Sequence, residues 1–84
     1  MHDRIDVIRD SAMRNQEEVR TIRETYRQGM RIHLLNMDDI QAPPIGTVGT
    51  VIGVDDIGSV MVAWDNGSSL SVIPGIDEIE IVEE

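Results

Sequence analysis

The 84-residue chain contains no cysteine, no lysine and no phenylalanine, and it has one tryptophan and one tyrosine. Without cysteine it can form no disulfide, no thiolate metal site and no cysteine nucleophile. With so few aromatic side chains, a hydrophobic core must be filled by isoleucine, valine, leucine and the five methionines. A chain this short has room for one small domain, whose core is marginal unless every element contributes to it.

Long apolar runs and catalytic motifs are also missing. No segment approaches the roughly 20 apolar residues that span a bilayer, and the N-terminus is polar from His2 onward, unlike a secretory signal. His33 is the only other histidine, and neither a nucleophile elbow nor a phosphate-binding loop ending in lysine occurs. We therefore expect a cytoplasmic protein that is not an enzyme and that has no cofactor and no metal site.

The formal net charge of −9 is unevenly distributed. In residues 1–27, arginines and acidic residues balance, whereas residues 28–84 hold Arg31 as their single basic residue among many carboxylates. The second part of the chain should therefore repel polyanions and attract cationic surfaces.

The first part of the chain has a helical apolar period. Residues 3–27 contain neither proline nor glycine, and Gly29 stands where a helix would stop. A spacing of alternating three and four residues, typical of a coiled-coil seam, runs through Ile5, Ile8, Ala12, Asn15, Val19, Ile22 and Tyr26. The seam can pack on the chain's own domain or on a second copy. We expect packing in its C-terminal half and self-association in its N-terminal half, with Asn15 setting the register.

From Met30 onward the pattern becomes that of short strands. Alternating apolar residues separated by turn signals predict five strands at 31–37, 47–54, 59–64, 69–73 and 78–82. Gly49 and Gly53 mark bends or bulges, and Asn66-Gly67 predicts a type I′ hairpin turn. A long first loop, a tight hairpin and a final short turn describe a five-stranded SH3-like barrel. We thus predict a mainly β domain at 29–84 preceded by an N-terminal helix at 1–28.

Several motifs of this region resemble one known family. They are YRQGMR at 26–31, MDD at 37–39, PIGTVGTV at 44–51, VDDIG at 54–58 and WDNGS at 64–68. In this order they are similar to the small bacterial and phage module called domain of unknown function 4314, over residues 19–82. The resemblance implies the barrel fold and a protein of phages or other mobile elements, and it implies no activity.

Carboxylates beside the turns are the candidate binding residues. The Asp38–Asp39 and Asp55–Asp56 pairs lack the alternating ligand spacing of a calcium loop, and aspartate in turns usually accepts backbone amides. Trp64 can complete the core or form a platform at the end of its strand. The surface that we expect to meet a partner comprises Asp38, Asp39, Asp55, Asp56, Trp64 and Asp65.

Three functions fit these observations to different degrees. The first is a non-catalytic, acidic protein-interaction module of a phage or mobile element, with a protein partner and self-association through the helix. The second is an inhibitor that places its carboxylates in the basic groove of a host nucleic-acid enzyme, such as a defence nuclease. The third, a small barrel that binds nucleic acid, is disfavoured because phosphate binding needs cations that residues 28–84 lack.

Overall fold

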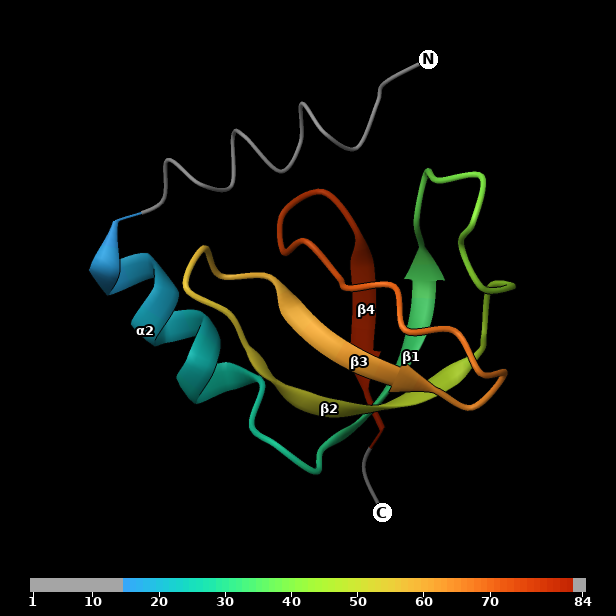
Figure 1. Cartoon of the computed structure of the whole chain (residues 1–84), viewed down its shortest axis with the longest axis horizontal. Coiled ribbons are helices and arrows are strands. Elements are labelled where there is room, and N and C mark those ends of the chain that lie inside the picture. Colours follow the sequence, from blue (N-terminus) through green and yellow to red (C-terminus); the bar gives the residue numbers. More distant parts are fainter. Residues whose placement is uncertain (1–14, 83–84) are drawn as a thin grey trace.

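The computed structural model describes residues 15–82, and the seam residues Ile5, Ile8 and Ala12 lie outside this range. Within the described range, one helix precedes four strands (Figure 1). They are α2 (Gln16–Thr25), β1 (Arg31–Asn36), β2 (Val48–Val54), β3 (Val60–Trp64) and β4 (Glu78–Ile81). The prediction of a mainly β domain with a preceding helix is confirmed in this coarse form.

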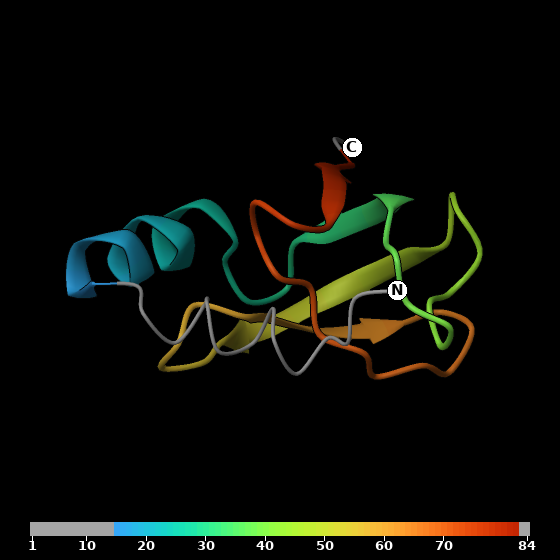
Figure 2. The same ribbon diagram turned by 90° about the horizontal axis from the view of Figure 1, so that it is seen from above.

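The four strands form one open antiparallel sheet in the order β3-β2-β1-β4. Gly49 is the pairing partner of both Ile32 on β1 and Trp64 on β3. A register shift between Val51 and Gly53 marks a bulge in β2, as predicted at Gly53. Figure 2 shows that α2 lies beyond one end of the sheet, beside the turn that joins β2 to β3.

Alternation along each strand separates a buried face from an exposed one. On β3, Val60, Val62 and Trp64 are buried, while the residues between them are exposed. Together with buried residues of β1, β2 and the segment after β3, they form a core without phenylalanine. Its fully buried side chains are Ile32, Leu34, Val51, Val60, Val62, Val72 and Ile73.

The predicted strand at 69–73 does not form, and the structure shows four strands where five were expected. This segment meets β3 only through the Val60–Val72 bridge, in which each residue donates to the other at 2.8 Å. At Leu70, side chains satisfy the backbone in place of a ladder. The Leu70 amide donates to Ser68 Oγ at 3.3 Å, and its carbonyl accepts from the indole Nε1 of Trp64 at 2.8 Å. The alternating sequence therefore gives an extended segment that is only partly joined to the sheet.

The helix α2 begins after Asn15, inside the range that was predicted as one continuous helix. This residue has extended backbone angles (φ −80°, ψ 169°), and its side chain accepts the Glu18 amide, so it is the N-cap of α2. Asn15 therefore does not occupy a helical seam position. Val19 and Ile22 are buried within the chain, and Tyr26 and Ile22 contact the domain's core, as expected for the C-terminal half of the helix. No helix within residues 15–82 is long and apolar enough to cross a membrane.

The hairpin after β3 has a different turn from the predicted one. A type I′ turn needs positive φ at Asn66, but no non-glycine residue in the described range has positive φ. Instead, Gly67 takes φ 93°, its amide donates to the Trp64 carbonyl, and the Trp64 amide donates to the Ser68 carbonyl. This is the three-residue hairpin with a glycine bulge, in which only the glycine needs the left-handed region.

Candidate functional site

The expected acidic surface is divided between the two ends of β2. Asp55 and Asp56 follow the last residue of β2, whereas Asp65 donates its amide to the carbonyl of Val48, the first residue. Asp38 lies in the loop that joins β1 to the start of β2, which Figure 1 shows on the side away from α2. The carboxylates therefore do not form a single patch.

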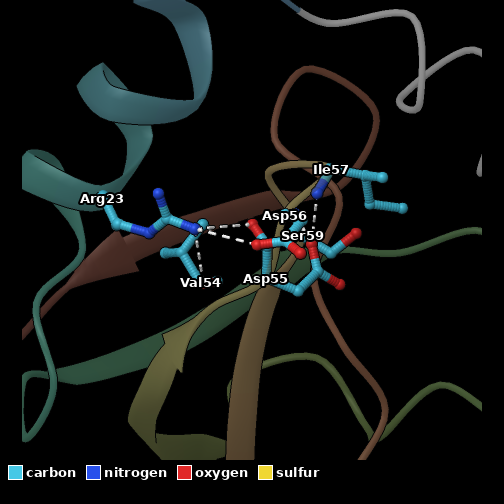
Figure 3. A network of polar contacts seen from close by, with 6 residues as sticks. All are labelled: Arg23, Val54, Asp55, Asp56, Ile57 and Ser59. Carbon is cyan, nitrogen blue, oxygen red and sulfur yellow. Dashed lines mark hydrogen bonds and ion pairs between the residues drawn. The ribbon is translucent and has the colours of Figure 1, made fainter. Parts of the chain in front are cut away.

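At the helix end of β2, Asp55 organises the turn and Arg23 attaches the helix to it (Figure 3). The Asp55 carboxylate accepts the amides of Ile57 and Ser59 at 3.1 and 2.9 Å. The Arg23 guanidinium donates to the carbonyls of Val54 and Asp55, each at 3.3 Å. It lies 3.7 Å from the exposed carboxylate of Asp56. Asp55 thus has the structural role of a turn residue, and Asp56 is the carboxylate that faces solvent here.

At the other end of β2, the only arginine of the sheet pairs with Asp65. The Arg31 guanidinium donates to both carboxylate oxygens of Asp65, at 2.9 and 2.6 Å, and to the Thr50 hydroxyl at 2.8 Å. The hydrogen bonds from Arg31 are the main cause that holds the pKa of Asp65 below its ordinary value; desolvation opposes them, and the charge of Arg31 adds to the lowering. Arg31 is therefore engaged within the fold, and Asp65 offers a partner less negative charge than its sequence position suggested.

Trp64 does not belong to the surface. Its side chain is 3% exposed, and its indole nitrogen donates to the Leu70 carbonyl. Of the two roles that the sequence allowed, the structure shows the core role. The tryptophan shares the buried face with Val60 and Val62 because all three have the same phase on β3.

The loop between β1 and β2 carries the most exposed large apolar residues of the described chain. Ile40 is 97% exposed and Ile45 is 74% exposed. The loop is nevertheless held from within, because Met37 is buried and Ala42 packs against the core. We call residues 38–45 the acidic loop, since Asp38 and Asp39 precede Ile40.

Backbone contacts hold the acidic loop in one shape. The carboxylate of Asp39 accepts the Gln41 amide at 2.7 Å, and its carbonyl accepts the Ala42 amide at 3.0 Å. Pro44 accepts both the amide and the hydroxyl of Thr47, at 3.0 and 2.6 Å. The loop therefore presents two isoleucines to solvent from an ordered backbone.

A family comparison identifies the unit that carries these features. The model of the family described as "Domain of unknown function (DUF4314)" matches residues 15–82. The chain belongs to this family. A comparison with curated proteins finds no match. The matched range contains α2 with its N-cap, the four strands and the acidic loop.

Two features of the DUF4314 domain were missed from the sequence. Asp77 is only 5% exposed, and its carboxylate accepts the Ile73 amide at 2.8 Å, which closes the turn before β4. The sequence signal for this turn was the position of an aspartate four residues after the apolar pair Val72-Ile73. The exposure of Ile40 and Ile45 had no sequence signal, because isoleucine in a short loop is as readily buried. Residues 15–82 contain no group of three or more side chains suited to hold a metal ion.

Proposed function

We propose that this DUF4314 domain is a non-catalytic protein-interaction module of a phage or other mobile element, acting in the bacterial cytoplasm. The observation that carries the proposal is the acidic loop, in which Ile40 and Ile45 are exposed on a backbone held by Met37 and Ala42. A single exposed apolar residue is ordinary on a protein surface. Two on one ordered loop, beside a pair of carboxylates, favour contact with another protein.

The energetics of the acidic loop suit such a contact. Burying one fully exposed isoleucine against a partner contributes about 1.5–3 kcal/mol. Because the loop is ordered before binding, less conformational entropy is lost on association. Asp38 is exposed and lies beside Ile40, so a partner with lysine or arginine around an apolar depression is the complementary surface.

We also infer that the fold is a small barrel of the SH3-like kind, with residues 69–73 as its incomplete fourth strand. The support is the order of the elements together with the Val60–Val72 bridge, which brings this segment alongside β3. A closed or nearly closed sheet would leave loops as the variable, partner-facing parts of the domain.

The inhibitor function is the special case in which the partner is a nucleic-acid enzyme. It is supported by the net charge alone, because the carboxylates lie at both ends of β2 and not in one row. Direct binding of nucleic acid is disfavoured further by Arg31, whose guanidinium is engaged by Asp65 and Thr50.

Self-association through Ile5, Ile8 and Ala12 stays a prediction, since these residues lie outside the described range. Light scattering of the full chain tests it against a variant with Ile5→Asp and Ile8→Asp. A larger mass for the wild type would support self-association, and equal monomeric masses would contradict it.

Affinity capture from a bacterial lysate tests the interaction function. The bait is the full chain, and the loop variant carries Ile40→Ala and Ile45→Ala. The matched control carries Ile52→Ala and Ile76→Ala, at isoleucines that are 50% and 52% exposed elsewhere. We expect a basic protein to be retained by the wild type and the control, and lost from the loop variant and at high salt. The proposal would be refuted if the same protein were retained by the loop variant as by the wild type and at high salt as at low salt.

A further inference from the structure

We propose that a serine-lined groove beside β3 binds an extended peptide segment of the partner, with basic side chains flanking the segment. The inference rests on the proposed function and names the form of the partner. The groove has a volume of about 380 Å³, and it is lined by Gln41, Ser59, Ser68, Ser69, Leu70, Ser71 and Ile73. None of these lining residues carries a charge.

The groove follows the segment that failed to become a strand. Between the Val60–Val72 bridge and the hydrogen bond from the Trp64 amide to the Ser68 carbonyl, no backbone-to-backbone hydrogen bond within residues 15–82 joins Ser69 or Leu70 to β3. Four consecutive residues of this segment, 68–71, line the groove, and a lining that follows a chain segment suits an extended peptide better than a compact ligand.

Ser59 is the strongest indication that the groove binds a polar group. This residue is only 4% exposed, yet its hydroxyl has no hydrogen-bond partner among residues 15–82. Its amide and carbonyl are used by Asp55 in the turn. Leaving a buried hydroxyl without a partner is unfavourable, because the desolvation of the polar group is not compensated. A ligand that supplies a donor or an acceptor at this point would remove that cost.

The chemistry of the lining indicates a main chain as the ligand. A serine hydroxyl both donates and accepts, and so matches either the N–H or the C=O of a peptide bond. The Ser68 hydroxyl accepts the Leu70 amide and keeps its own proton to donate. Leu70 and Ile73 add apolar surface for an aliphatic side chain.

Charge complementarity indicates what flanks the peptide. Gln41 belongs to both the groove and the acidic loop, and Asp38 and Asp39 precede it by three and two residues in the sequence. A peptide whose central residues are uncharged and whose ends carry lysine or arginine would satisfy both the neutral lining and the acidic rim. The isoleucines of the acidic loop and the groove then contact adjoining parts of one partner.

Selection from a displayed library of random dodecapeptides on the full chain tests the groove. Affinities of enriched peptides are then measured with Ser69→Tyr, which fills the groove, and with Ala63→Tyr, at an exposed position on the opposite face of β3. We expect basic peptides that lose tenfold or more in affinity with Ser69→Tyr and nothing with Ala63→Tyr. Ser59→Ala should weaken binding about fivefold to tenfold without lowering the free energy of unfolding. N-methylation of the peptide's central amides should abolish binding.

Absence of any enriched peptide, or equal affinity for both tyrosine variants, would overturn the proposed groove. Unchanged affinity with Ser59→Ala would contradict the proposed contact between this hydroxyl and the peptide. If peptide affinity falls with the Ile40 and Ile45 substitutions but not with Ser69→Tyr, the groove proposal is overturned and the acidic loop is the interaction surface. Peptides that depend on Ser69 alone would support the groove and contradict the role of the loop.

Discussion

Substituting Gly49 by alanine should destabilise the domain, although the same change in most strands would stabilise it. A methyl group at this position would lie 2.6 Å from Val62 Cγ1, 2.8 Å from Trp64 Cε3 and 3.2 Å from the Ala63 carbonyl oxygen. None of these atoms is the end of a flexible chain. Val62 is 1% exposed, and Trp64 is held by its hydrogen bond to Leu70. The contact can be relieved only by moving β3 away from β2 at the centre of the core.

The expected magnitude follows from two opposing effects. Replacing a strand glycine by alanine ordinarily contributes about 0.5–1 kcal/mol of stability. Forcing a methyl group into a packed core costs about 1–3 kcal/mol. A net loss of about 1–2 kcal/mol would lower the urea midpoint by about 1–2 M, for a slope near 1 kcal/mol per M in a domain of this size.

Urea unfolding followed by circular dichroism measures this loss, and the fluorescence of the single tryptophan gives a second signal. Gly53→Ala is the matched control, because its methyl group would meet only the mobile end of Met61, at 3.4 Å. We expect the control to be as stable as the wild type or slightly more so. A Gly49→Ala variant of equal or greater stability than the wild type would refute the packing of Trp64 over β2.

Three further predictions follow from hydrogen bonds of the domain. Trp64→Phe removes the indole donor to the Leu70 carbonyl and should cost about 1–3 kcal/mol in thermal or urea unfolding followed by circular dichroism; an unchanged midpoint would contradict this contact. Because Arg31 lowers the pKa of Asp65 in the folded state, their pair adds stability above the unfolded pKa of about 3.9, and this stability is lost as pH falls through the lower folded pKa. The difference in unfolding midpoint between the wild type and Asp65→Asn should accordingly shrink between pH 6 and pH 2.5, and a constant difference would count against the pair. Asp77→Ala leaves the Ile73 amide without its acceptor and should lower the free energy of unfolding by about 1–3 kcal/mol. The control Glu78→Ala, at the exposed neighbouring position, should change the unfolding midpoint little.

Most of the strand positions were predictable because alternation and turn residues are local signals. The predicted strands at 31–37, 47–54, 59–64 and 78–82 differ from the observed ones by at most one residue at either end. Residues 69–73 have the same alternation but do not form a strand. There, the Ser68 hydroxyl and the Trp64 indole take the backbone groups of Leu70, and such competition depends on three-dimensional placement.

The start of α2 at Asn15 had a local signal that was open to two interpretations. Asn15 continues the seam spacing, and asparagine is also among the best N-cap residues. The structure shows the cap. Sequence spacing alone could not decide between them, because a seam position and a cap position both accept asparagine.

The site was less predictable than the fold. That Asp55 would organise its own turn followed from residue type, since its partners lie two and four residues away. The pairing of Arg31 with Asp65 joins residues 34 positions apart, and it depends on the register of three strands. The groove at Ser59 depends on a strand that did not form, so no sequence pattern could indicate it.

The most direct test of the proposed interaction surface is a nuclear magnetic resonance titration of the ¹⁵N-labelled full chain with the captured partner. We predict that the largest shift changes and line broadening occur at residues 38–45, at Ser59 and at residues 68–73. Changes confined to the exposed face of the sheet around Met61 and Ala63, or to α2, would contradict it.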